Sequence, residues 1–351
     1  MTPTSQTLGV GIIGAGGIAR GAHQPGFAAQ PDVEIVAAAD PMPGRAAQFA
    51  RDFDIPHAYT DYRDLLARDD IDVVSVGTPP VAHAEATIAA LEAGKHVFCE
   101  KPMAMNANEA QAMADAAEGA GRVLAIDFQT RFSRDARRAH ELVAGGHLGA
   151  PNFARATMLR QAGVPTWGTF TSKAANGGGA LIDIGVHALD RALYVLGHPT
   201  PLSVWGAIGR PFGNRDGVTN RWGSWDPSNY DVDDYAFAGI RFEGDLILLL
   251  ECSWILRIGQ SVERLVVSAA DGGLEISPLR VFHDRDGFHS TETYDTSGET
   301  RKEHVISVTD FINAVRTGVE PTVTAAQGVT VTRIVDAIYR SAAERTEIPL
   351  T

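Results

Sequence analysis

The chain has 351 residues, of which 44% are hydrophobic and 21% charged, and its formal net charge is −13. These values are typical of a globular protein with room for two domains, and the acidic balance argues against nucleic acids and anionic membranes as partners. The two cysteines, Cys99 and Cys252, lie in separate apolar stretches, so we expect buried free thiols. The first seven residues are polar and lack the apolar core of a signal peptide, so we expect a cytoplasmic protein.

The first third of the chain alternates strand and helix patterns. Runs rich in valine and isoleucine predict strands at 8–13, 33–40, 73–76, 96–99 and 123–127. Alanine-rich amphipathic segments between them predict helices at 18–29, 44–52, 84–93 and 109–119, the last preceded by Asn106 as its N-cap. This alternation is typical of a doubly wound parallel sheet, which we place in a first domain spanning residues 1–125.

The turn after the first predicted strand carries the sequence Gly14-Ala-Gly16-Gly17-Ile18-Ala19. Gly14 permits a tight turn, and Gly16, which has no Cβ, lets a diphosphate approach the backbone. The N–H groups at Gly17 and Ile18, where the next helix begins, then face the anion. The pattern predicts a dinucleotide-binding turn, and the alternative is an ordinary strand–turn–helix corner.

The second predicted strand ends at Asp40, within the same strand–helix–strand unit as the glycines. A carboxylate at this position can accept hydrogen bonds from both hydroxyls of an adenosine ribose, and it repels a 2′-phosphate. Asp40 therefore favours NAD over NADP. Arg45, five residues further on, is the counterargument, because an arginine can bind a 2′-phosphate. The alternative for Arg45 is a solvated charge in the first turn of a helix.

Other predicted strands also end in candidate ligand-binding residues, because the carboxyl ends of parallel strands face the ligand crevice. We expect Lys101, in Glu100-Lys101-Pro102, to point its ammonium into the cleft, with a surface lysine as the alternative. Arg131, just past a hinge at 121–130, is expected either to contact substrate or to form an interdomain salt bridge. The expected cofactor contacts from these loops are Thr78, Pro79, His83, Glu100, Lys101 and Gln129.

Beyond the hinge the pattern changes to longer strands joined by turns. Strands are predicted at 152–159, 202–208, 235–242, 246–254, 264–268, 273–276 and 280–283, and helices at 133–144, 302–317 and 325–343. The alternation and the glycine-containing turns indicate an antiparallel meander. We therefore expect a second α+β domain at 126–351, built on a large, mostly antiparallel open sheet.

Three glycines at 177–179 precede a predicted helix that contains Asp183 and His187. The two side chains are four residues apart and therefore share one face of the helix. Gly185 lies between them, and its destabilising effect of about 1 kcal/mol would be explained if a flat ring approached the backbone there. The alternatives are a core histidine, an aspartate that complements the helix dipole, and a metal-binding pair, for which no further ligands are evident in the sequence.

A segment at 221–235 mixes aromatic and acidic residues, and Trp167 is a further aromatic candidate. Aromatic faces stack on the CH groups of a sugar ring while carboxylates accept its hydroxyls. The alternative is a packed loop or a dimer contact.

Five motifs occur in order: Gly14-x-Gly16-x-x-Ala19, Thr78-Pro79, Glu100-Lys101-Pro102, Gln129-x-Arg131-Phe132 and Asp183-x-Gly185-x-His187. Together they resemble the Gfo/Idh/MocA oxidoreductase family over nearly the whole chain. The resemblance implies a Rossmann domain followed by an α/β domain whose open sheet commonly forms homodimers or homotetramers. It also implies that Lys101, Asp183 and His187 are catalytic.

We therefore expect reversible oxidation of a secondary alcohol on a sugar, anhydrosugar or cyclitol, with NAD preferred, NADP possible and no metal. In this reaction His187 is the general base, Lys101 stabilises the alkoxide, and Asp183 orients His187 or holds a neighbouring hydroxyl. The expected substrate contacts are Lys101, Arg131, Trp167, Asp183 and His187. Transient use of bound NAD and a non-catalytic regulator are the alternatives.

Overall fold

The computed structural model describes residues 7–298 and 301–350. The cytoplasmic location was expected from the first seven residues, and residues 1–6 lie outside the described part. The chain forms two compact units. Unit 1 contains residues 1–129 and 301–329, and unit 2 contains residues 130–300 and 330–351. The predicted division into residues 1–125 and 126–351 therefore leaves out that residues 301–329 also belong to unit 1.

Unit 1 is built on a six-stranded sheet in the order β3-β2-β1-β4-β5-β6. Every pair in it is parallel, which confirms the predicted doubly wound sheet. Its strands are β1 (Leu8–Ile13), β2 (Val33–Ala39), β3 (His57–Tyr59), β4 (Val73–Val76), β5 (His96–Glu100) and β6 (Leu124–Asp127). The edge strand β3 is only three residues long and was not predicted, because so short a run carries little periodicity.

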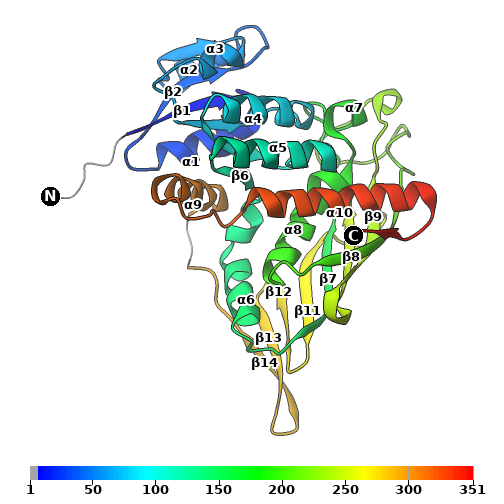
Figure 1. The fold of residues 1–351 in the computed structure, drawn as a ribbon. Coiled ribbons are helices and arrows are strands. Elements are labelled where there is room, and N and C mark those ends of the chain that lie inside the picture. The colour runs from blue at the N-terminus through cyan, green and yellow to red at the C-terminus, as the bar shows by residue number, and fades with distance from the viewer. Residues whose placement is uncertain (1–6, 299–300, 351) are drawn as a thin grey trace, which may run out of the picture. The chain divides into compact units, whose positions relative to one another are not determined.

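One helix of unit 1, α9 (Glu303–Thr317), comes late in the chain, long after the strands of the sheet on which it packs. In chain order the helices of unit 1 are η1 (Ala19–His23), α1 (Gln24–Ala28), α2 (Arg45–Asp52), α3 (Tyr62–Leu66), η2 (Pro80–Ala82), α4 (His83–Glu92), α5 (Ala107–Ala120) and α9. Figure 1 shows α9 beside α1 and the end of β6. Phe311 of α9 contacts Phe27 and Phe98 in the buried core, which explains why this late segment packs on the Rossmann sheet.

Unit 2 is built on a nine-stranded sheet in the order β14-β13-β12-β11-β7-β10-β9-β8-β15. Only the β7–β10 pair is parallel among the described strands of this sheet, so the predicted mostly antiparallel sheet is confirmed. Its strands are β7 (Pro151–Leu159), β8 (Pro201–Gly209), β9 (Tyr235–Phe242), β10 (Ile247–Ser253), β11 (Val262–Ala269), β12 (Gly273–Ile276), β13 (Arg280–Arg285), β14 (Phe288–Thr293) and β15 (Ile348–Pro349).

Helices cover one face of this sheet (Figure 1). The helix α8 (Val186–Val195) packs on β7 and β10, and α6 (Arg134–Ala144) packs on β12. The remaining helical segments are η3 (Gln129–Phe132), α7 (Lys173–Asn176), η4 (Leu181–Gly185), η5 (Pro227–Asn229), η6 (Glu243–Asp245) and α10 (Ala325–Glu344), the last passing from unit 1 into unit 2. On the other face of the sheet, Trp205 of β8 is exposed.

Both cysteines are buried free thiols, as expected. Burial raises the pKa of the Cys99 thiol to about 12, so the thiol is protonated at neutral pH. Within residues 7–298 and 301–350, we find no helix with the length and apolar character needed to cross a membrane.

Candidate active site

The glycine-rich turn of unit 1 has the geometry of an anion cradle. Gly14 has a φ of +92°, and a Cβ there would lie 2.7 Å from the carbonyl of Gly77, so only glycine fits this turn. A Cβ at Gly16 or Gly17 would meet nothing within 4 Å, so open space lies beside the backbone where a diphosphate is expected. The helical segment that follows begins after Ile18. These residues therefore fit a dinucleotide.

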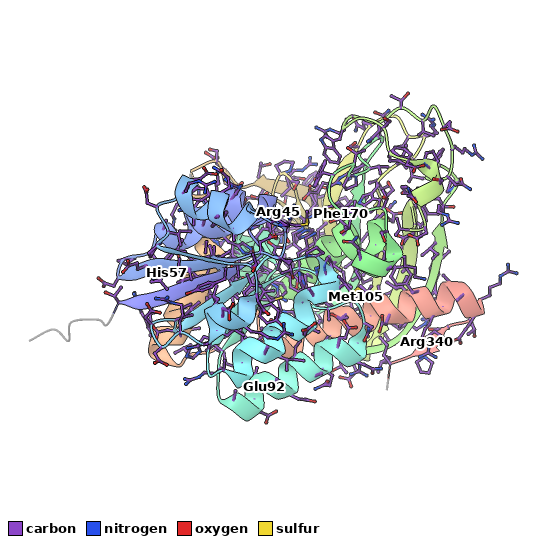
Figure 2. All side chains as sticks on the ribbon, turned by 90° about the horizontal axis from the view of Figure 1, so that it is seen from above. Arg45, His57, Glu92, Met105, Phe170 and Arg340 are labelled. Atoms are coloured by element: carbon purple, nitrogen blue, oxygen red, sulfur yellow. The ribbon has the colours of Figure 1, made fainter. Side chains whose placement is uncertain are left out.

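Asp40 follows β2 and is almost fully buried. Its carboxylate accepts the N–H of Ala15, inside the glycine turn, at 3.0 Å and the N–H of Met42 at 2.9 Å. Arg45, labelled in Figure 2, lies 3.6 Å from the same carboxylate and is about half exposed. Asp40 thus braces the turn in addition to its expected role at the ribose, and Arg45 is partly neutralised by Asp40 instead of standing alone in solvent.

The loops after β4 and β5 are tied together by His83. Its buried imidazole lies 2.9 Å from the carbonyl oxygen of Thr78 and 2.7 Å from that of Pro102. Burial lowers the pKa of His83 and outweighs the opposing effect of the two carbonyl groups. His83 therefore braces the loops that carry Thr78 and Lys101. The sequence placed it among the cofactor contacts, and the structure gives it this internal role instead.

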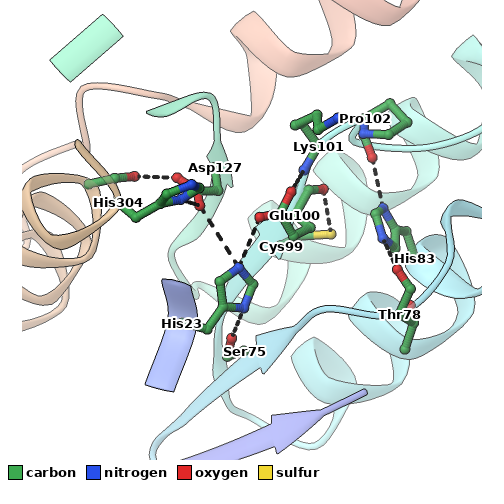
Figure 3. A network of polar contacts seen from close by, with 11 residues as sticks. His23, Ser75, Thr78, His83, Cys99, Glu100, Lys101, Pro102, Asp127 and His304 are labelled. Atoms are coloured by element: carbon green, nitrogen blue, oxygen red, sulfur yellow. Dashed lines mark hydrogen bonds and ion pairs between the residues drawn. The ribbon is translucent and has the colours of Figure 1, made fainter. Parts of the chain in front are cut away.

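Lys101 is half-buried and follows the end of β5, as the sequence predicted for a residue at a strand tip. Glu100, expected among the cofactor contacts, is buried and points inward, where its carboxylate accepts from His23 and from the main-chain N–H of Lys101 (Figure 3). Burial alone would raise the pKa of Glu100, but His23, Lys101 and His304 outweigh it and lower the pKa to about 2. Glu100 thus anchors the strand tip. Of the other expected contacts, Pro79 is exposed and Gln129 is half-buried.

In unit 2, Asp183 lies in the π-helical turn η4 and His187 lies one turn further on, in α8. The single helix predicted here is therefore interrupted in its hydrogen-bond register. Trp254, which follows β10, donates its indole N–H to the Asp183 carboxylate at 2.8 Å. Asp233 accepts the N–H groups of Gly179 and Leu181 and so caps the start of η4.

The structure gives a different reason for a glycine at position 185 from the one that the sequence suggested. A Cβ at Gly185 would lie 2.9 Å from the sulfur of Cys252 and 3.0 Å from a methyl of Leu181. The glycine therefore lets η4 pack on β10, and the approach of a flat ring is not needed to explain it. The same holds at Gly179, whose Cβ would collide with the backbone of Asp233.

Arg131 is fully buried, and its guanidinium forms two bonds, at 2.8 and 2.6 Å, to the equally buried carboxylate of Asp190 in α8. Both residues belong to unit 2, so the pair is not the interdomain salt bridge considered above. It fastens η3 to the helix that carries His187. The expectation that Arg131 contacts substrate is not supported by this burial.

Aromatic side chains extend from Trp254 toward solvent. Phe170, labelled in Figure 2, lies 6.4 Å from Trp254 and 6.0 Å from Trp167, measured between ring centroids. Trp222 lies 5.1 Å from Trp167, which is 52% exposed. The row of Trp254, Phe170, Trp167 and Trp222 thus joins Asp183 to an exposed aromatic face. Other members of the 221–235 segment serve internal packing, namely Trp225, Tyr230, Asp233 and Asp234.

The sequence did not reveal the roles of Trp254 and Asp190, and it placed Asp233 in a segment expected to face a sugar, whereas Asp233 caps η4. Each acts through a residue far away in the chain, so no local motif marks it. The strand-end position of Trp254 was the only signal, because strand ends are where site residues gather.

The six-stranded parallel sheet and its glycine-rich turn are those of a dinucleotide-binding Rossmann domain. Residues 8–128 match the model of the oxidoreductase family with an NAD-binding Rossmann fold, and residues 136–275 match the Gfo/Idh/MocA C-terminal domain. The chain belongs to the Gfo/Idh/MocA family. The resemblance stated from its motifs is thereby confirmed, as are an oxidoreductase activity and NAD as cofactor.

Three relatives illustrate the match. The chain is 38% identical to a D-glucoside 3-dehydrogenase of Escherichia coli K12, over 99% of both chains. Its fold matches a levoglucosan dehydrogenase solved with NADH and levoglucosan, with a TM-score of 0.87, 26% identity and coverage of 98% of this chain and 100% of the other. It also matches an aldose-aldose oxidoreductase of Caulobacter crescentus, with a TM-score of 0.82, 26% identity and coverage of 98% and 100%.

Proposed function

We propose that this protein oxidises a ring secondary alcohol of a sugar, an anhydrosugar or a cyclitol with NAD, and that a D-glucoside oxidised at C3 is its best substrate. The observation that carries this proposal is the 38% identity to a D-glucoside 3-dehydrogenase over 99% of both chains. The exposed face of Trp167 and the carboxylate of Asp183, joined by the aromatic row, suit the apolar CH surface and the hydroxyls of a pyranose.

His187 takes the proton of the reacting hydroxyl, since a neutral imidazole nitrogen can accept a proton as a general base. Lys101 places its ammonium beside the oxygen as negative charge develops on it, which lowers the barrier. Asp183, held by the Trp254 indole, accepts a neighbouring hydroxyl of the substrate or orients His187. Bound NAD supplies the acceptor for the hydride. The alcohol thereby loses a hydride and a proton, and the product is a ketone.

The residues proposed to hold NAD are those of the unit 1 cradle. Gly14, Gly16, Gly17 and Ile18 present the turn to the diphosphate, and Asp40 accepts the adenosine ribose hydroxyls. We propose NAD over NADP because Asp40 would repel a 2′-phosphate, although Arg45 lies only 3.6 Å away. Thr78, Pro79 and Gln129 are proposed to line the nicotinamide end.

The test is an absorbance assay for reduced nicotinamide, with NAD or NADP, on methyl β-D-glucopyranoside, levoglucosan, D-glucose and myo-inositol. We expect net NADH formation, fastest with the glucoside and NAD, and a carbonyl at C3 of the isolated product. Lys101→Ala and His187→Ala should lower turnover by about 100-fold or more while NADH binding, followed by its fluorescence, is retained. Normal turnover in both variants would refute the assignment.

The likeness to an aldose-aldose oxidoreductase favours one second candidate, in which NAD is reduced and reoxidised on the enzyme. This candidate is distinguished by the absence of net NADH when a single sugar is supplied and by exchange of oxidation state when two sugars are supplied.

We also propose a homodimer or homotetramer formed through the uncovered face of the unit 2 sheet. Trp205 of β8 lies on that face and is 44% exposed, so it offers an apolar surface to a second copy of the chain. Light scattering of the purified chain tests this, and Trp205→Glu should shift the mass toward the monomer. Since the reaction uses the cell's pyridine nucleotides, a cytoplasmic location is part of the same proposal.

A further inference from the structure

A cluster of four titratable side chains in unit 1, three of them buried, has no role in the steps described above (Figure 3). It consists of His23, Glu100, Asp127 and His304, which come from η1, β5, β6 and α9. His23 and Asp127 are fully buried, and Glu100 is 5% exposed. Two carboxylates thus share a water-excluded space, where each requires hydrogen-bond donors.

His23 stands between the two carboxylates. Its Nε2 lies 3.1 Å from Oε1 of Glu100 and 3.8 Å from Oδ2 of Asp127, and its Nδ1 lies 2.7 Å from the hydroxyl of Ser75. The Nε2 atom carries at most one proton, so it can serve only one carboxylate well. At these distances it serves Glu100.

Asp127 receives its donors from α9 instead. The His304 Nδ1 lies 2.7 Å from Oδ2, and the Ser307 hydroxyl donates to Oδ1 at 2.8 Å. The two side chains are three residues apart, on one face at the start of the helix, where the helix dipole also favours an anion. Because α9 satisfies Asp127, His23 remains available to Glu100.

The chain of contacts ends at Lys101, since Oε2 of Glu100 accepts the main-chain N–H of Lys101 at 3.0 Å. Glu100 therefore uses one oxygen for His23 and the other for Lys101. We propose that His304 is a positioning residue for Lys101, acting through Asp127, His23 and Glu100. This inference rests on the catalytic role proposed above for Lys101.

Loss of His304 leaves Asp127 one donor short, and the nearest replacement is the His23 Nε2, only 3.8 Å away. A shift of His23 toward Asp127 removes a donor from Glu100 and loosens the main chain at Lys101. Neutralising Asp127 removes this competition, so a second substitution there should restore the position of Lys101.

A buried metal ion is the competing explanation. His23, Glu100 and Asp127 offer ligand atoms that lie within 4.8 Å of one another. The His23 Nε2 and the Asp127 Oδ2, however, are each engaged by a protein partner, Glu100 and His304 respectively. The contacts thus account for the cluster as a hydrogen-bond network.

The first test needs no substrate. Hydrogen exchange at the Lys101 amide is measured in the wild type, in His304→Leu, in His304→Asn, which keeps a donor near the Nδ1 position, and in His304→Leu with Asp127→Asn. We expect faster exchange at Lys101 in His304→Leu, and protection close to the wild type in the other two. The matched control is His289→Leu, because His289 also contacts an aspartate through Nδ1 but is 97% exposed. It should leave exchange at Lys101 unchanged.

Kinetics form the second test. In His304→Leu we expect kcat to fall by about 10- to 100-fold with little change in NADH affinity, because a misplaced catalytic group affects the chemical step. Unchanged exchange and kcat in that variant, or a further loss on adding Asp127→Asn, would overturn the inference. So would a stoichiometric metal ion that Asp127→Asn removes. If His304→Leu does not fold, Ser307→Ala provides the same test through the second donor of Asp127.

Normal turnover in Lys101→Ala would instead refute the proposed function. In that case the exchange measurement at the Lys101 amide still decides whether the network holds the strand tip.

Discussion

The packing role assigned to Gly185 can be tested by adding a single methyl group. In Gly185→Ala the new Cβ would lie 2.9 Å from the Cys252 sulfur and 3.0 Å from a Leu181 methyl, well inside the roughly 3.5–4.0 Å of a favourable contact. Overpacking of this kind destabilises by about 1–3 kcal/mol. The better helix propensity of alanine offsets about 1 kcal/mol. We therefore expect a net loss of up to about 2 kcal/mol in the free energy of unfolding.

Urea unfolding followed by tryptophan fluorescence measures this change, because all five tryptophans of the chain lie in unit 2, the unit that contains Gly185. Adding Cys252→Ala removes the sulfur that the methyl meets. The two substitutions should therefore be coupled by about 0.5–3 kcal/mol, with the double variant more stable than the sum of the single losses predicts.

The matched control is Gly119→Ala in α5, where a Cβ meets nothing within 4 Å. Followed by circular dichroism, it should not lose stability. If Gly185→Ala and Cys252→Ala are additive, or if Gly185→Ala keeps its stability but loses substrate affinity, the packing argument is refuted. The second result would support the approach of a ligand ring that the sequence suggested.

Three further predictions concern His304 in unit 1 and the contacts of Asp190 and Asp183 in unit 2. Burial opposes the charged form of His304, but Asp127, Glu100 and Glu303 outweigh it and raise its pKa above 6.5. Its contribution to stability is therefore complete below about pH 6.5 and is lost as pH rises through the raised pKa. In His304→Asn the melting temperature of the protein should depend less on pH across this window. An unchanged pH dependence would contradict the assignment. Arg131→Met should destabilise the protein by about 3–5 kcal/mol, because it leaves the Asp190 carboxylate buried and unpaired. Adding Asp190→Leu should restore most of the lost free energy of unfolding, measured with urea. If the double variant instead loses as much as the two single variants together, Arg131 and Asp190 do not stabilise the protein as a pair. Trp254→Phe removes the donor to Asp183 and should lower kcat/KM by about 10- to 150-fold, since a hydrogen bond to a charged group contributes about 1.5–3 kcal/mol. A wild-type kcat/KM would show that Asp183 needs no such support.

Local patterns in the sequence determined the type of most elements and the places where ligand-binding loops occur. The parallel sheet follows from valine-rich runs spaced by alanine-rich helices, and Asn106 caps α5 as predicted, since its side chain accepts from the N–H of Glu109. Gly14 could be assigned to a tight turn because a positive φ is a property of one residue. The family resemblance extended this to the trio of Lys101, Asp183 and His187.

Tertiary structure decided what several polar residues do. Arg131, His83 and Glu100 all stand beside the expected motifs, yet their charges and donors are used inside the protein, by Asp190, by two loop carbonyls and by His23. The partners lie up to 77 residues away in the chain for these contacts, and 177 residues away for Asp127 and His304. A buried polar group must find a partner wherever the fold brings one, and sequence spacing does not encode that distance. For this reason the sequence determined which residues gather at the strand ends, and only the folded units decided which of them face inward.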